Sequence, residues 1–338
     1  MRWLLSLAIV GVIFGVILPR LVDMEAVWAT LVRMTWLELV TLGLVSAWNL
    51  VTYWFLLMLS LPGLSFAQAM IVTETSTAAA NALPGGQAVG MGLAYRMYSS
   101  WGFRRSAIAL ALVISGVGDL FAKLAMPAMA LFVLVLYGDA NESLRTASYI
   151  ALVILVAGGV VSARALRSES TARRAGDALA AAATRVVRLW GRSPVTGWGE
   201  HLSHFRAETA ESMRGRWPAL VGVSLLSHFS LFVVLLLAMR HVGISQQEVG
   251  WAEALGSFAF VRLLSAIPIT PGGIGVIELG LTASLALAGG RRVEVVAAVL
   301  VFRAMTYLLQ IPFGAVTYLV WQHSAAGRRT EIEAPAAP

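Results

Sequence analysis

The stretch Leu-Pro-Gly-Gly at Leu83–Gly86 returns in the second half of the chain as Thr-Pro-Gly-Gly at Thr270–Gly273. The match continues past the turn, because the pair Arg104–Arg105 follows the first copy at the same spacing as Arg291–Arg292 follows the second. In a membrane chain, two hydrophobic segments interrupted by Gly and Pro at matching places in two halves indicate a substrate pathway near the middle of the bilayer. The repeat therefore predicts a transporter or lipid translocator.

The composition is that of a membrane protein. Apolar residues make up 58% of 338 residues, 13% are charged, and the mean hydropathy is +0.78, which lies outside the range of soluble domains. A helix needs about 20 apolar residues to cross a hydrocarbon core of about 30 Å. The stretches that approach or exceed this length are Trp3–Pro19, Trp36–Ser60, Ala107–Tyr137, Ala147–Ala163, Pro218–Met239 and Val293–Trp321.

Two further apolar stretches, Leu64–Leu83 and Trp251–Thr270, are long enough to cross but carry many polar residues. Each stretch ends at the first residue of one copy of the repeated turn. The apolar runs are far longer than the alternating strands of a membrane barrel. We therefore predict an all-α polytopic membrane protein, with about six full transmembrane helices plus two re-entrant or broken helical hairpins in an inverted repeat.

We expect a single membrane domain over residues 1–338. Its parts are a first repeat at about 36–137, a crossing helix at 147–163, a basic linker at 164–216, a second repeat at about 217–321 and a polar tail at 322–338. If Ala107–Tyr137 crosses once, with Pro127 inside it, three crossings separate the starts of the two repeats. An odd number of crossings inverts one repeat relative to the other.

Arginine sets the expected orientation. The linker carries ten Arg against five acidic residues, and basic segments stay on the cytoplasmic side of a membrane. This places the linker and both termini in the cytoplasm, and the connection Arg20–Thr35 on the outside. We expect the inner, or cytoplasmic, membrane of a bacterial cell.

Charges inside apolar segments are costly and mark functional sites by default. Asp119 and Lys123 are four residues apart on one helix and can neutralise each other, which makes a purely structural pair one interpretation. Glu74 and Arg262 occupy nearly equivalent places in the two halves and are candidates for a gating ion pair. The other ionisable candidates for lipid binding or translocation are Arg96, Glu278 and Arg303.

Glu278 lies in the first turns of the helix that follows Gly273, where a carboxylate faces the positive end of the helix dipole. Arg303 needs a partner within its apolar segment, and Glu278 is the most economical one. The pair can simply brace the hairpin. Alternatively, Arg303 takes a lipid phosphate when the pair opens.

The repeated turns are candidates for the translocation site itself. Glycine adopts backbone angles that other residues avoid, and a helix N-terminus offers free N–H groups to an anion. The alternative is a re-entrant corner without a ligand. The turn residues assigned to the site are Pro84, Gly85, Gly86, Pro271, Gly272 and Gly273.

No sequence motif indicates catalysis. The chain lacks the metalloprotease, nucleophile-elbow and phosphate-loop patterns, its histidines are scattered, and it has no cysteine. We therefore expect no catalytic residue, no metal, no cofactor and no nucleic-acid surface, and a protein that is not an enzyme.

The stretch Ile269–Glu278, followed by Gly289 and Arg303, resembles the lysylphosphatidylglycerol synthase transmembrane family. The family consists of flippase-like membrane domains, found alone or beside glycosyltransferases, and the similarity runs from about residue 5 to 322. The resemblance implies that Glu278 and Arg303 matter. Ser115 and Gly116 stand where relatives often carry Glu-Arg. The aminoacyl-transferase domain of the lipid-modifying members is missing, so we do not expect the chain to make lysyl lipid.

These observations predict a protein that moves or handles an anionic or lipid-linked amphiphile between leaflets. Its expected partners are membrane lipids with anionic headgroups. One alternative is a membrane scaffold or subunit that presents lipid substrate to a separate glycosyl- or aminoacyl-transferase. Another is a structural partner in a membrane complex.

Overall fold

A computed structural model of the chain describes residues 24–83, 86–137, 215–265 and 273–333, with a few single residues between Val153 and Glu200. Every regular element in these parts is a helix. The first half contains α3 (Met24–Val32), α4 (Trp36–Ser60), α5 (Phe66–Ala82), α6 (Gly86–Ser100) and α7 (Arg105–Tyr137). The second half contains α11 (Trp217–His241), α12 (Trp251–Leu264), α13 (Val276–Leu287), α14 (Arg292–Arg303), the π-helical turn η3 (Ala304–Leu308) and α15 (Gln310–Glu333).

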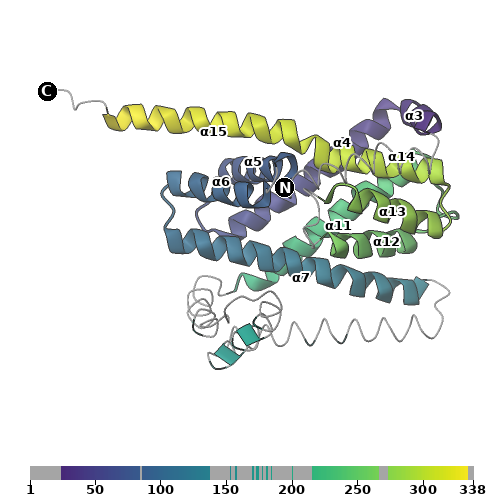
Figure 1. The fold of residues 1–338 in the computed structure, drawn as a ribbon, viewed down its shortest axis with the longest axis horizontal. Coiled ribbons are helices and arrows are strands. Elements are labelled where there is room, and N and C mark those ends of the chain that lie inside the picture. The colour runs from purple at the N-terminus through teal and green to yellow at the C-terminus, as the bar shows by residue number, and fades with distance from the viewer. Residues whose placement is uncertain are drawn as a thin grey trace.

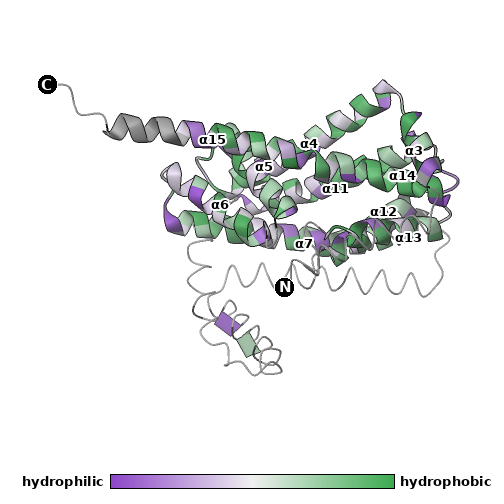
Figure 2. Cartoon of the chain, turned by 45° about the horizontal axis from the view of Figure 1, so that its top comes forward, coloured by the Kyte–Doolittle hydropathy of each residue, from purple (hydrophilic) through white to green (hydrophobic). Residues whose placement is uncertain are grey.

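Within the described residues, four long helices are apolar enough to cross a membrane, namely Trp36–Ser60, Arg105–Leu136, Trp217–His241 and Arg292–Ser324. They coincide with four of the predicted crossings, and α7 is a single helix with Pro127 inside it. Figure 2 shows hydrophobic residues dominating α11 to α14, with more polar residues on α5 and α6. The protein is therefore a multi-pass membrane protein. The predicted crossings at 3–19 and 147–163, and most of the linker, lie outside the described residues.

Two helical hairpins lie between the long helices. In the first half α5 packs along α6, and in the second half α12 packs along α13. α5 and α12 correspond to the two polar stretches that the sequence singles out. Each half thus consists of a long helix, a hairpin of shorter helices and another long segment. In both views the first hairpin lies at one end of the molecule and the second at the other (Figures 1 and 2).

The two halves exchange contacts reciprocally. The first arm of each hairpin packs against the last helix of the other half, α5 against α15 and α12 against α7. α4 and α11 pack against each other between them. Asn49 of α4 fixes this contact, because its side-chain amide donates to the Ser227 carbonyl at 2.7 Å and to Ser230 Oγ at 2.8 Å. Polar links of this kind hold helices together where water is absent.

Local sequence explains where several helices begin. Thr35 and Glu38 form a capping box at the start of α4, and Ser65 and Gln68 form one at the start of α5. Such boxes satisfy backbone N–H groups that the first helical turn leaves free. Among the described residues the apolar core forms three clusters: one around the first hairpin, a larger one around the second, and a small one where α4, α7 and α11 meet.

The connection predicted for residues 20–35 contains a helix that we did not expect, α3. It forms because one of its faces is buried: Val27 is 1% exposed and belongs to the larger core cluster, and α3 packs against α14. A nine-residue helix has too little periodicity to be recognised from the sequence, and its stability comes mainly from packing.

Candidate functional site

A buried ion pair lies where the second hairpin meets the last membrane helix. Arg303 Nε donates to Glu278 Oε1 at 2.6 Å, and the two side chains are 11% and 5% exposed. The other carboxylate oxygen of Glu278 accepts the backbone N–H of Gly275 at 2.6 Å. Both oxygens of this buried carboxylate are therefore satisfied. The Glu278–Arg303 pair predicted from the sequence is confirmed.

Two glycines shape the backbone that holds Glu278. Gly273 has φ of +68° and Gly275 has φ of +84°, conformations that side chains with a Cβ rarely adopt. Gly275 is also the residue that caps α13, three positions before Glu278. The glycines thus direct the start of α13 so that its first-turn carboxylate reaches Arg303.

A π-helical turn follows Arg303 directly. In η3 the Leu309 N–H donates to the Ala304 carbonyl at 3.0 Å, and such single π turns are frequent at functional sites. The Tyr307 ring lies against the Arg303 guanidinium, 4.2 Å from its centroid, and the Tyr307 hydroxyl donates to the Asn81 carbonyl at 2.7 Å. Tyr307 therefore connects Arg303 to the end of α5 in the first hairpin.

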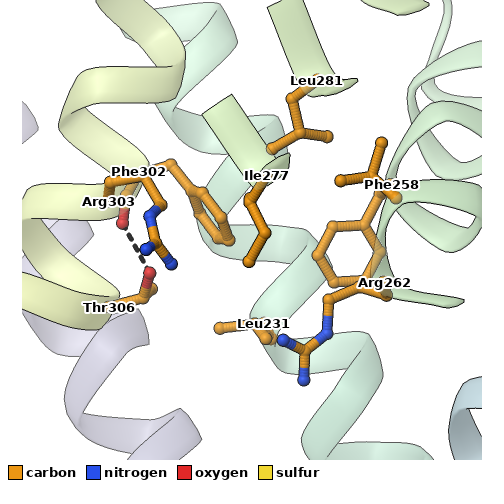
Figure 3. Close-up of a pocket in the computed structure, with 9 residues that line it drawn as sticks. Leu231, Phe258, Arg262, Ile277, Leu281, Phe302, Arg303 and Thr306 are labelled. Atoms are coloured by element: carbon orange, nitrogen blue, oxygen red, sulfur yellow. Dashed lines mark hydrogen bonds between the residues drawn. The ribbon is translucent and has the colours of Figure 1, made fainter. Parts of the chain in front are cut away.

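A small cavity of about 50 Å³ lies between α11, α12, α13 and α14. Figure 3 shows the guanidinium groups of Arg262 and Arg303 on opposite sides of Leu231. Thr306 adds a hydroxyl, which donates to the Phe302 carbonyl at 2.7 Å. The remaining lining residues are apolar: Phe258, Val261, Ile277, Leu281 and Phe302. The cavity thus combines two cations with a largely apolar wall.

Arg262 is the less neutralised of the two arginines. Its Nε is buried and has no hydrogen-bond partner among the described residues. Tyr53 of α4 interacts with Arg262, and also with Ser227 and Asp119. Arg303, in contrast, is charge-balanced by Glu278. The cavity therefore carries a net positive charge.

A comparison with family models matches residues 3–314 to the family described as the lysylphosphatidylglycerol synthase TM region. The chain belongs to this family. The match covers all the helices that line the cavity, and it makes this a lipid-related membrane protein. A search among curated proteins gives no significant match.

The prediction that Glu74 and Arg262 form an ion pair is wrong. Glu74 is fully buried, but its Oε1 accepts the Trp54 indole N–H at 2.8 Å, and its Oε2 has no partner among the described residues. The α5 face that carries Glu74 packs against α15 at Gly314, whose missing side chain admits the Glu74 backbone. Arg262 faces the cavity of the second half instead.

The first repeated turn differs from the second. A Cβ on Gly86 would clash with the Ala79 carbonyl, and a Cβ on Gly90 would lie 2.5 Å from the Ser76 carbonyl. These two glycines, four residues apart, let α6 approach the backbone of α5. Gly86 therefore serves helix packing. Pro84, Gly85, Pro271 and Gly272 lie outside the described residues.

Two more predictions concern α6 and α7. Asp119 and Lys123 form the expected ion pair, with Oδ2 and Nζ 2.6 Å apart. Arg96 is exposed on α6 and does not line the cavity. The structure thus brings Arg262, Glu278 and Arg303 together at the cavity. Tyr53, which interacts with both Arg262 and Asp119, connects the Asp119–Lys123 pair to this site. Arg96 lies apart from it.

Sequence reasoning missed three residues at or near the site. Thr306 and Tyr307 lie in the π turn after Arg303, where we expect regular α-helix. No sequence pattern indicates this π turn. His228 is buried 3.4 Å from Asp119 Oδ1. Its presence in an apolar run was a usable signal, because a titratable side chain in a membrane helix marks a functional site.

Proposed function

We propose that this protein moves a lipid with an anionic, phosphate-bearing headgroup between the leaflets of the membrane, and that the cavity between Arg262 and Arg303 receives the headgroup. The observation that carries the proposal is the presence of two guanidinium groups around a cavity within a membrane bundle. Guanidinium binds phosphate through paired N–H donors. The cavity holds only about 50 Å³, so we expect the helices around it to move apart when a phosphate group enters.

The charge balance supports an anionic ligand. An unneutralised cation within the bilayer is expensive, and such residues persist where they serve a pathway. Because Glu278 neutralises Arg303, a headgroup can bind Arg262 first. It can then share the Arg303 guanidinium with Glu278.

We further propose that the two halves are inverted repeats whose hairpins enter the membrane from opposite faces without crossing it. The reciprocal packing of α5 on α15 and α12 on α7 supports this arrangement. So do the lengths of α6, α12 and α13, which have 15, 14 and 12 residues, and of α5, which has 17, because a crossing helix needs about 20. Both termini would then face the cytoplasm in the inner membrane, as the basic linker requires.

Translocation needs no covalent step, which fits a chain without a catalytic motif. The protein is then a carrier and not an enzyme. A separate lipid-modifying transferase can supply its lipid. If the chain instead presents lipid to such an enzyme as a scaffold, it binds lipid but does not move it.

A vesicle assay tests the proposal. The purified protein is reconstituted into phosphatidylcholine vesicles that contain fluorescent phosphatidylglycerol, and a membrane-impermeant reductant bleaches the outer leaflet. We expect bleaching to continue past the outer-leaflet fraction with the protein present and to stop there without it. Arg262→Gln should slow the movement at least tenfold, whereas Arg96→Gln, at an exposed arginine outside the cavity, should not. Bleaching confined to the outer leaflet with folded protein would contradict translocation and favour the scaffold.

A further inference from the structure

A second group of ionisable side chains lies where α7, α11 and α4 meet, beside the cavity. Asp119 Oδ2 pairs with Lys123 at 2.6 Å, and Asp119 Oδ1 lies 3.4 Å from Nε2 of His228. His228 is 1% exposed. The Tyr53 ring lies 6.4 Å from the His228 ring, between centroids, and Tyr53 also interacts with Arg262. A chain of contacts thus runs from His228 to the cavity.

The two ring nitrogens of His228 both face oxygens that accept hydrogen bonds. Nδ1 lies 3.0 Å from the Ser224 carbonyl, which can only accept, so Nδ1 carries a proton. Nε2 faces the carboxylate of Asp119, which also accepts when ionised. When the imidazole is neutral, neither Nε2 nor the carboxylate carries a proton, so no hydrogen bond joins them, and Nε2 has no partner among the described residues. One added proton on Nε2 converts the contact into a charge-assisted hydrogen bond.

We propose that Asp119 and His228 together bind one exchangeable proton, and that this proton crosses the membrane with the anionic lipid. The inference rests on the proposed function, to which it adds a coupling ion and an energy source. Lys123 pairs with the second carboxylate oxygen of Asp119, so the exchangeable proton lies between Asp119 Oδ1 and Nε2 of His228. Histidine suits this role because it ordinarily gains and loses a proton near neutral pH.

The charged groups around His228 explain the coupling. α7 contributes Asp119 and Lys123, which cancel each other, and α4 contributes Tyr53. α12 contributes Arg262 behind Tyr53, and α14 contributes Arg303 on the far side of the cavity, where Glu278 neutralises it. With His228 neutral, Arg262 alone attracts an anion. Protonation of His228 adds a second positive charge nearby, in a medium of low dielectric constant, and strengthens anion binding.

The step balances in protons and charge. A proton adds to the lone pair of Nε2 when the site faces one side, and leaves the same atom when the site faces the other. One proton and one phosphate monoanion cross together, so no net charge moves. Asp119, whose side chain is 32% exposed, gives the buried imidazole its route to the surface of the bundle.

The test uses the full chain in phosphatidylcholine vesicles with fluorescent phosphatidylglycerol and a gradient of one pH unit. A carrier that moves one proton with each lipid concentrates label in the leaflet on the alkaline side, up to about tenfold, in either orientation of the protein. His228→Gln should move label but distribute it evenly. The matched control is His323→Gln, because His323 also faces the carbonyl four residues before it, at 2.8 Å, but is exposed. It should behave like the wild type.

A double variant, Asp119→Asn with Lys123→Gln, removes the carboxylate without leaving a charge unpaired, and should also abolish the asymmetry. Protein-free vesicles give the baseline, and an ionophore that collapses the gradient should abolish the effect. An even distribution with the wild type would overturn proton coupling while lipid movement stands. Asymmetry that persists in His228→Gln would exclude this site. Absence of any movement would overturn the proposed function together with this inference.

Discussion

The two hairpins occupy equivalent places in the chain but use their glycines differently. In the first hairpin Gly86 and Gly90 bring α6 against the backbone of α5. In the second, Gly273 and Gly275 adopt positive φ and aim Glu278 at Arg303. The last glycine of the repeated turn therefore serves a packing contact in one half, as Gly86, and a charged site in the other, as Gly273.

Their charged residues differ in the same way. Glu74 of the first hairpin is held by an indole N–H and has no cation partner among the described residues, whereas Glu278 of the second has both an arginine and a backbone donor. The cavity lies against the second hairpin alone. A duplicated sequence can thus keep its architecture in both copies and its binding site in one. We expect the first hairpin to be a structural support and the second to bind the ligand.

The largest effect is expected at the buried ion pair of the second hairpin. Removing one partner of such a pair costs about 3–5 kcal/mol, because the other charge is left unpaired. Glu278→Gln and Arg303→Gln should each lower the stability measured by denaturation in detergent. The double variant should be milder than their sum.

Strict additivity in this double-mutant cycle would show that the two side chains do not interact. The control is the surface pair Glu248–Arg291, whose side chains are 32% and 60% exposed. Solvent screens such a pair, so its cycle should be close to additive.

The next effect tests the packing role of the first hairpin. Gly90→Ala places a methyl group against the Ser76 carbonyl, and overpacking of this kind costs about 1–3 kcal/mol. The loss of transport should follow the loss of folded protein. Gly92→Ala on the same helix meets no atom within 4 Å and should be neutral or stabilising. A Gly90→Ala protein that remains folded but does not transport would place a ligand at the first hairpin.

A smaller effect is expected for the contact that joins the hairpins. Tyr307→Phe keeps the ring against Arg303 but removes the hydrogen bond to Asn81, which is worth about 1 kcal/mol. Transport per folded molecule should fall if the first hairpin positions Arg303 through this bond. Tyr318→Phe, which loses only an exposed contact with Gln322, is the control. Equal transport in both variants would separate the two hairpins functionally.

The smallest effect lies in the connection before α12. The backbone N–H of Ser245, the Ser245 hydroxyl and Arg291 lower the pKa of Glu248. A lowered pKa in the folded state contributes stability above the ordinary glutamate pKa, and this contribution is lost as the pH falls through the folded value. Acidification from pH 6 to about 3.5 should therefore lower the melting temperature of the wild type slightly more than that of Glu248→Gln. Equal slopes would exclude this contribution.

Sequence periodicity was sufficient for the long helices, because a crossing helix needs an unbroken apolar run. The Glu278–Arg303 pair was also predictable, because both charges lie in apolar segments and each can neutralise the other. The partner of Glu74 was not predictable, because it depends on which face of α5 packs against α15 at Gly314. No feature of the amino-acid composition indicates the π turn that positions Tyr307. The partner of His228 was not predictable either, because Asp119 lies more than a hundred residues away, on another helix.

The central claim is that the second hairpin binds the anionic headgroup, and lipid-dependent thermal stabilisation tests it directly. A ligand that binds only the folded protein raises its melting temperature. In neutral detergent, added phosphatidylglycerol should raise the melting temperature of the wild type and of Arg96→Gln, and should leave that of Arg262→Gln unchanged. An equal rise in all three proteins would contradict the account.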